Sequence, residues 1–475
     1  MIGIIVRKEL LALYRDRRIL ILALALLAMW SMLYLIALGQ QQRLQTERAQ
    51  IGETTRDQWD KQGIKNPHRG AHFGMYVFRP DVPLAAFDPG IEPYVGQAIW
   101  LEPHRRNMAR FNPDADDGAG TRFGHIDPAF LLAALFPLLI MVLAFAQATQ
   151  EREQGTLRML QSMGVTNFAI LGAKLIAIAT CLAALLLPVF VLLGISVLLT
   201  KGVAHFDWTV LLRVACLAAT YFLYYLAIAA IGLAVGSLSA GSRNALFLLV
   251  VVWAGFVLAA PRAASAIAQA RVPMPTATQF WAAIAQDYER GLPGDPNLAT
   301  QVRNFEAQLL RQYDVKSLGE VPIGVNAARR LIRDAYADKV HAYHFDALWS
   351  RYGQQQRVLR WASVFSPTIA LSASSSVLSG TSLAHQRRFE DQAETYRQAF
   401  NTALDKWDMA QTKGNVSYET QYAADKVWQS IPAFHYNSPT IGFALRSGWP
   451  DLMILAAWTL AATGLLWVAA KRWKP

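Results

Sequence analysis

The sequence predicts a polytopic α-helical membrane protein with six transmembrane helices, and three observations support that prediction. The 475 residues are 53% hydrophobic and only 17% charged, whereas a soluble domain carries about 25% charged residues. Six apolar runs are long enough to cross about 30 Å of hydrocarbon. Lys and Arg are concentrated in the short segments that connect these runs. The high hydrophobicity also excludes a disordered chain.

The predicted spans alternate with aqueous segments of very different length. The first span is expected to be a retained signal-anchor, because its apolar run exceeds the roughly 7–15 residues of a cleaved signal peptide. The predicted order is a connecting helix at 1–18, a first span at 19–38, a first insertion at 39–127, a second span at 128–149, a short connection at 150–167, a third span at 168–199, a fourth span at 209–236, a short loop at 237–243, a fifth span at 244–260, a second insertion at 261–449, a sixth span at 450–470 and a tail at 471–475.

The distribution of basic residues predicts that both chain termini are cytoplasmic. The four short segments 1–18, 150–167, 237–243 and 471–475 carry eleven Lys and Arg against four Asp and Glu. The two insertions together carry 31 basic and 28 acidic residues, so their charges almost balance. Since cytoplasmic loops are rich in Lys and Arg, both insertions are expected to be extracytoplasmic. Topology thus explains most of the formal charge of +11, and no nucleic-acid partner is expected.

The two insertions differ in their expected structure. The first begins with a helix-compatible stretch at 40–61, which can extend the first span as a stalk. It then becomes rich in Pro and Gly, which favours short strands and loops and makes the insertion mixed or irregular. The second insertion is mainly helical by pattern. Two identical Ser-Pro-Thr-Ile phrases begin at Ser366 and Ser438, and each is predicted to start a helix with Pro at its first position.

No motif in the sequence predicts an enzyme. The chain has no Gly-x-x-x-x-Gly-Lys-Ser/Thr phosphate loop, and no His-Glu-x-x-His, Gly-x-Ser-x-Gly or Cys-x-x-Cys motif. Residues 378–382 resemble the signature loop of an ATPase but are expected to form a turn. The acidic, Gly-rich stretch 114–117 is expected to be a solvated loop. We therefore expect no catalytic residues and no cofactor in this chain.

Two histidine pairs have spacings that would let both members bind one metal ion from one face of a helix. His68 and His72 are four residues apart, and His341 and His344 are three residues apart. Pro67 and a nearby glycine argue against a stable helix at the first pair. We interpret both pairs as surface or packing residues, with metal ligation as the alternative, and assign no metal site.

The most informative short segment is 150–167, which follows the second span. Glu151 and Glu153 at its start suit a helix N-terminus. Leu157 and Leu160 have helical spacing, so an amphipathic helix along the membrane face is expected. A solvated turn between two spans is the alternative on spacing alone.

At this segment the chain resembles the permease subunits of ABC-2 type transporters. That family has a Glu-rich Gly-Thr-Leu segment after its second span and a Gly-x-Lys sequence entering its third, here Gly172 to Lys174. The resemblance implies that the loop docks on a separate ATPase subunit, and the loop 237–243 looks like a second contact. The residues thereby assigned to ATPase coupling are Glu151, Arg152, Glu153, Gly155, Thr156, Leu157, Leu160, Ser239 and Arg243.

Two further regions agree with this resemblance. The basic, amphipathic segment 1–18 looks like the connecting helix that such permeases lay on the inner membrane surface, with Ile5 facing lipid. Its residues expected to reach lipid phosphates are Arg7, Lys8, Arg15, Arg17 and Arg18. The stretch from Ser366 to Arg397 is similar to an uncharacterised domain in the ABC-2 branch grouped with multicopper-enzyme-maturation permeases.

The resemblance implies an ATP-driven permease, with exporter activity, in the bacterial cytoplasmic (inner) membrane. Its implied partners are two ABC ATPase subunits that bind ATP and Mg²⁺, a second permease of the same or a homologous chain, and membrane lipid. Tyr221, Tyr224 and Tyr225 on the fourth span are candidates for a translocation path, with packing as the alternative. Two other functions stay open. They are a mechanotransmission permease that moves its extracytoplasmic domains without transport, and a membrane-anchored extracytoplasmic enzyme.

Overall fold

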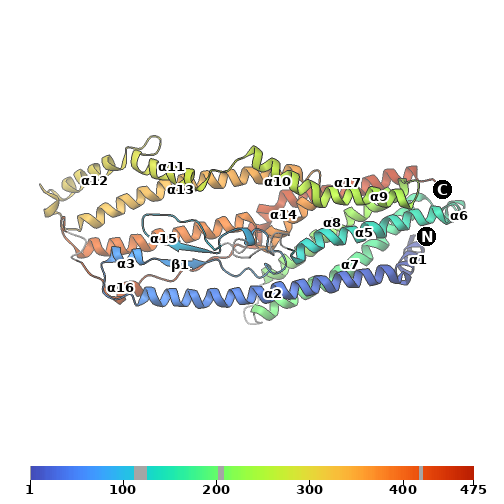
Figure 1. Cartoon of the computed structure of the whole chain (residues 1–475), viewed down its shortest axis with the longest axis horizontal. Helices are drawn as coiled ribbons and strands as arrows, with labels where there is room; N and C mark the ends of the chain where they lie inside the picture. Colours follow the sequence, from blue (N-terminus) through green and yellow to red (C-terminus); the bar gives the residue numbers. More distant parts are fainter. Residues whose placement is uncertain (1, 112–125, 202–207, 417–420, 475) are drawn as a thin grey trace.

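Six helices are long and apolar enough to cross a membrane, which confirms the predicted multi-pass helical character. A computed structural model describes residues 2–111, 126–201, 208–416 and 421–474, so the predicted loop 114–117 lies outside the described residues. The six candidate spans are α2 (Arg17–Asp60), α5 (Pro128–Glu153), α7 (Asn167–Lys201), α8 (Trp208–Leu238), the continuous run Ser242–Arg271 and α17 (Ile441–Arg472). They form an elongated bundle with both chain termini at one end (Figure 1). We call this end the terminal end.

Helix α8 lies at the centre of the bundle because small residues let α5 approach it closely. A Cβ atom added at Gly232 would lie 2.7 Å from the Cβ of Ala144, and one added at Gly236 would lie 2.8 Å from the carbonyl oxygen of Phe145. Real side chains do not fit at these distances, so both glycines are needed for the contact. Helix α8 also packs against α7 and α17.

Helix α2 continues far beyond the length needed to cross a membrane. Its 44 residues form one uninterrupted helix, which at 1.5 Å per residue is about 66 Å long. The predicted stalk 40–61 is thus the second half of α2. Near its far end, the buried Trp59 contacts Trp428 and Phe400 in a second hydrophobic core. We call the part of the molecule beyond the bundle, around this core, the distal region.

The fifth span is longer than the sequence predicted. It runs through α9 (Ser242–Ala254), the π-helical turn η4 (Gly255–Ala259) and α10 (Ala260–Arg271). Pro261 lacks a backbone N–H, so the regular hydrogen-bond ladder is interrupted there, and a wider turn continues the helix. The helix therefore continues to Arg271, beyond 260, where the predicted span ends.

The distal region is mainly helical and contains one small sheet. Its strands β1 (Met75–Phe78) and β2 (Ala98–Leu101) are antiparallel, with Met75 opposite Leu101. The other elements among the described residues are α1 (Ile2–Arg15), α3 (Pro67–Phe73), η1 (Glu92–Tyr94), α6 (Thr156–Ser162), α11 (Ala277–Arg290), α12 (Leu298–Tyr313), η5 (Leu318–Glu320), α13 (Val325–Ala362), α14 (Pro367–Ser379), α15 (Leu383–Gln411) and α16 (Asp425–Gln429). Figure 1 shows α2, α13 and α15 running along the long axis of the molecule.

Helix α14 belongs by sequence to the second insertion but packs inside the membrane bundle. Its Ala370, Leu371 and Leu378 are buried in the same hydrophobic cluster as α5, α7 and α8. The helix is only 13 residues long, which is too short to be recognised as a span. The predicted second insertion is therefore not a separate domain throughout its length.

Of the two Ser-Pro phrases, the first starts a helix as predicted and the second does not. Helix α14 begins at Pro367 with Ser366 as its N-cap residue. Helix α17 begins only at Ile441, after Thr440. The carbonyl oxygen of Pro439 accepts a hydrogen bond of 2.8 Å from Arg213, so this segment is held against α8 before the helix begins. The stretch 378–382 is the turn between α14 and α15, as expected, with Gly380 in a left-handed conformation at φ +86°.

Candidate functional site

The loop after the second span forms a short helix bounded by two glycines. Helix α6 lies between Gly155 at φ +71° and Gly164 at φ +78°, two backbone conformations that strongly favour glycine. Gly155 breaks the chain direction between α5 and α6, so the two helices do not merge. Leu157 of α6 is buried, whereas Met159 of α6 and Met163, the residue that caps its end, are 55% and 59% exposed. The helix therefore has one face on the bundle and one exposed apolar face.

Four charged side chains meet behind α6 and form what we call the four-charge cluster. Lys174 of α7 is 1% exposed, and its Nζ lies 2.8 Å from Oε1 of Glu9 and 3.0 Å from Oε1 of Glu151. Lys8 of α1 also donates to Glu151, at 2.6 Å. Thr156, the first residue of α6, donates to the other carboxylate oxygen of Glu151. The cluster thus joins α1, the end of α5, α6 and α7 with no net charge.

Arg152 and Glu153 attach the end of α5 to the turn between α8 and α9. The guanidinium group of Arg152 donates to the backbone carbonyls of Ser237 and Ser239, and at 3.2 Å to the carbonyl of Lys474. Oε1 of Glu153 accepts hydrogen bonds from the backbone N–H and the hydroxyl of Ser242, at 2.9 and 2.7 Å. Three segments distant in sequence are therefore held together at the terminal end.

A third set of hydrogen bonds connects α6 with the last helix. Gln161 of α6 donates to the side-chain oxygen of Asn167 at 2.9 Å. The amide group of Asn167 donates to the carbonyls of Ala470 and Trp473 at the end of α17, at 2.9 and 2.8 Å. A displacement of α6 would consequently be transmitted to α1, α5, α7, α17 and the α8–α9 turn.

The predicted coupling residues divide into buried and accessible groups. Glu151 and Leu157 are buried, and the structure gives them contacts inside the chain rather than a surface for a partner. The accessible or partly accessible members are Arg152, Glu153, Gly155, Thr156, Leu160, Ser239 and Arg243. Sequence reasoning missed Met159 as an exposed neighbour and Glu9 as the buried partner of Lys174. A lysine inside an apolar span was the signal that such a partner was needed.

Helix α1 packs more deeply than the predicted membrane-surface helix. Ile5 is buried against the bundle, so the expectation that it faces lipid was wrong. Lys8 points to the four-charge cluster and pairs with Glu151 instead of reaching outward alone. All five predicted surface residues are exposed, namely Arg7, Lys8, Arg15, Arg17 and Arg18.

The three candidate path tyrosines are buried inside the single chain. Tyr224 donates to the carbonyl of Ala133 at 3.1 Å, and Tyr225 donates to that of Leu132 at 2.8 Å. Tyr221 lies 3.3 Å from the hydroxyl of Ser375 on α14. These contacts are those of packing residues that tie α8 to α5 and α14. Tyr221 alone also lines a cavity.

That cavity lies between the bundle and the distal region. Its volume is about 480 Å³, and its lining comes from α5, α8, α13, α14 and α17. Asp451 of α17, on its wall, forms two hydrogen bonds with the guanidinium group of Arg360, at 3.1 and 2.9 Å. Asp88 also lines it, and burial raises the pKa of this carboxyl to about 6. The size suits a small ligand.

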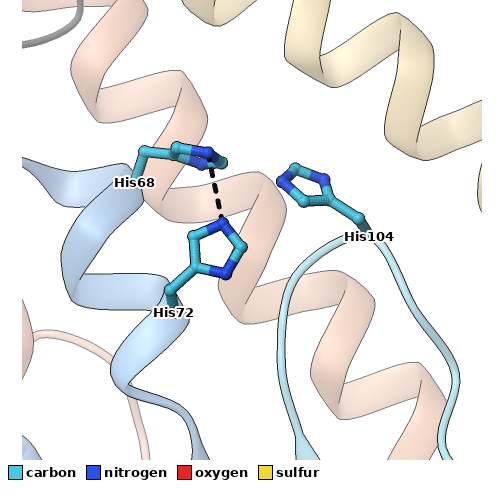
Figure 2. Close-up of side chains that lie close together, drawn as sticks. All are labelled: His68, His72 and His104. Carbon is cyan, nitrogen blue, oxygen red and sulfur yellow. Dashed lines mark hydrogen bonds between the residues drawn. The ribbon is translucent and has the colours of Figure 1, made fainter.

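The two histidine pairs have different surroundings. His341 is buried and shares a hydrogen bond of 2.8 Å with the carbonyl of Ala337, while His344 lies 2.9 Å from Asp287. His68 and His72 lie on α3, where the sequence argued against a helix, and burial lowers the pKa of His68 to about 3. In the described part of the chain, the only group of three or more potential metal ligands joins these two to His104. Figure 2 shows the three rings gathered between α3 and the loop after β2.

The fold defines a multi-pass helical membrane protein, and hydrogen bonds and ion pairs connect the ends of its helices at the terminal end. Comparison with known families gives two matches. Residues 120–285 match the model of the ABC-2 family transporter protein, and residues 277–437 match a domain of unknown function (DUF3526). The first match contains α6 and the whole α8–α9 turn, and it supports an ABC-2 permease. No curated protein and no solved structure matches the chain.

Proposed function

We propose that this chain is the membrane subunit of an ATP-driven ABC-2 transporter, and that α6 is its docking helix for a separate ATPase subunit. The match of residues 120–285 to the ABC-2 family is the observation on which the proposal rests. The arrangement of α6 agrees with it, because α6 has an exposed apolar face and lies beside the polar contacts that connect α1, α5, α7, α17 and the α8–α9 turn. Basic residues at the terminal end support a cytoplasmic location for this end.

The mechanism that we infer is mechanical. An ATPase dimer closing on ATP and Mg²⁺ would press on α6 and on the α8–α9 turn beside it. Because Arg152 and Glu153 tie that turn to α5, and Lys174 ties α7 to α1, the helices would move together and not one by one. Two copies of the ATPase and two permeases would complete the assembly in the bacterial inner membrane, surrounded by lipid.

Exporter activity is the first form of this proposal. The cavity of about 480 Å³ between the bundle and the distal region supports it, since an exported substrate would need a binding site where the bundle meets the distal region. The cavity is lined by both membrane helices and α13, so movement of the bundle would change its shape. An enzyme in the distal region has no comparable support in the described residues.

Mechanotransmission without transport is the second form, and one observation favours it. Helix α2 passes without a break from the terminal end to the core of the distal region, where Trp59 Nε1 donates to the carbonyl of Trp428 at 3.1 Å. A rigid helix of this kind would move the distal region when its other end moves. The extended length of α2 serves no purpose in simple membrane crossing.

Complex formation tests the docking assignment. The chain is co-expressed with a candidate ABC ATPase subunit, and the complex is isolated through a tag on the ATPase. Met163→Glu should abolish or strongly reduce recovery of the permease, because a charge would replace the exposed apolar contact. Tyr343→Glu is the matched control, since Tyr343 is 53% exposed on α13 in the distal region. Equal recovery of both variants would contradict docking through α6.

A further inference from the structure

The three histidines of this cluster come from two segments of the chain. His68 and His72 are one turn apart on α3, and His104 lies in the turn after β2. One ring nitrogen from each histidine lies within 4.8 Å of those from the other two. His72 is exposed and the other two are partly buried, so the group is open to solvent on one side. We propose that His68, His72 and His104 bind one divalent transition-metal ion, with Zn²⁺ as the test case.

The geometry of α3 is built to present its two histidines together. Asn66 caps the helix by accepting hydrogen bonds from the backbone N–H groups of His68 and Arg69, at 2.9 and 3.4 Å. A Cβ atom at Gly70 would lie 2.3 Å from the ring of Trp428, so glycine lets α3 lie flat on this tryptophan. The Nε2 atoms of His68 and His72 are 3.3 Å apart. Two imidazole nitrogens bound to tetrahedral Zn²⁺ at about 2.0–2.1 Å are separated by about the same distance.

The third histidine is held by a carboxylate in the manner expected of a metal ligand. His104 has φ +64°, a conformation that is unusual for a residue other than glycine. Its Nδ1 forms a hydrogen bond with the buried carboxylate of Asp334 on α13, which also accepts from Asn401 at 2.6 Å. A carboxylate on Nδ1 fixes the tautomer that leaves the Nε2 lone pair available for a metal.

The charges around the site are compatible with a cation. Arg330, one turn before Asp334, acts electrostatically on His68, and it is itself bound by Asp405 and Asp408. A modest movement of the His104 turn would bring its nitrogen to the ligand distance of the other two. Imidazole ligands favour zinc, copper and nickel over magnesium or calcium. The fourth position would remain for water or for an incoming ligand.

Metal binding by the full-length chain is the test, and it needs no ATPase. The protein is purified in detergent through a tag without histidine, stripped with a chelator and titrated with Zn²⁺ by calorimetry. We expect one Zn²⁺ per chain. His72→Ala and His104→Ala should each lower the affinity at least about ten-fold, and Asp334→Asn should lower it about 10- to 100-fold. Exposed His72 can be replaced without disturbing the core, so this variant stays informative if Asp334→Asn misfolds.

His435→Ala is the matched control, because His435 is an exposed histidine outside the cluster and should leave Zn²⁺ binding unchanged. X-ray absorption of the zinc-loaded protein should show imidazole nitrogens at about 2.0–2.1 Å. The proposal would be overturned by a wild-type chain that does not bind Zn²⁺, or by cluster variants that bind it like the His435 variant. Neither result would affect the docking of an ATPase on α6.

Discussion

The terminal end and the distal region each contain a polar centre, and the two are built in opposite ways. In the four-charge cluster, Glu9, Glu151 and Lys174 are buried and Lys8 is half-exposed, and the four ions pair with one another across α1, α5 and α7. The histidine cluster consists of imidazole rings and is open to solvent at His72. Charged side chains that neutralise one another between helices hold those helices in place, whereas imidazole nitrogens that solvent can reach are able to bind a ligand. We propose that the terminal end transmits movement and that the distal region binds a ligand.

The largest effect is expected at the centre of the four-charge cluster. Lys174→Met leaves Glu9 and Glu151 buried with only Lys8 between them, which should destabilise the chain by about 3–5 kcal/mol. Loss of helical circular dichroism on heating in detergent measures this effect. Adding Glu151→Gln should restore part of the stability, because Lys8 then balances Glu9. Exposed Arg7→Met is the control. A Lys174 variant as stable as that control would contradict a stabilising role for the four-charge cluster.

A pH effect is expected in the distal region from His385, which is 4% exposed. Burial lowers its pKa from 6.5 to about 3, helped by nearby arginines. Its contribution to stability is complete above pH 6.5 and declines as the pH falls toward 3, because the unfolded chain binds the proton first. At pH 5 the loss is about 2 kcal/mol. The dependence of thermal unfolding on pH should become shallower in His385→Gln and stay unchanged in His435→Gln; identical slopes would contradict the assignment.

A smaller effect is expected from the break between α5 and α6. Gly155→Ala places a side chain at φ +71°, where there is room for the Cβ atom but a backbone penalty of about 1–2 kcal/mol. Straightening of the junction should also reduce stimulation of the ATPase. Gly172→Ala is the matched control, since Gly172 lies inside α7 with open space around it and should gain slightly in stability. Equal behaviour of the two variants would show that the break has no role.

The smallest effect is expected from the buried tyrosines. Tyr225→Phe removes one hydrogen bond to Leu132 and should cost about 0.5–1.5 kcal/mol. If Tyr225 only packs, ATP hydrolysis by the complex should be unchanged. Altered hydrolysis at normal thermal stability would instead support the translocation-path interpretation.

The spans could be predicted from sequence because their signal is local. An apolar run such as that of α7 needs no partner to be recognised, and the number of candidate spans was predicted correctly. Helix α14 was missed because its 13 residues pack in the bundle through tertiary contacts. A local rule also misjudged α3, where Pro67 occupies a favourable first position and the helix packs closely on Trp428.

Both polar centres lay beyond sequence reasoning for a common reason. Lys174 and Glu9 are separated by 165 residues, and His104 and Asp334 by 230. Residue type and spacing along one segment identified Glu151 and the pair His68 and His72, but not the members that folding brings to them. The sequence pattern indicates half of each site, and only packing supplies the rest.

Hydrolysis of ATP in the reconstituted complex tests the central claim most directly. We expect no hydrolysis by the chain alone, and hydrolysis by the complex with its ATPase that depends on the terminal end. Glu153→Gln, which loosens the bond between α5 and Ser242, should keep the complex intact and weaken the coupling of hydrolysis to the permease. Tyr343→Glu should behave like the wild type. A complex whose hydrolysis is unaffected by Glu153→Gln and by Met163→Glu would contradict transmission through the terminal end.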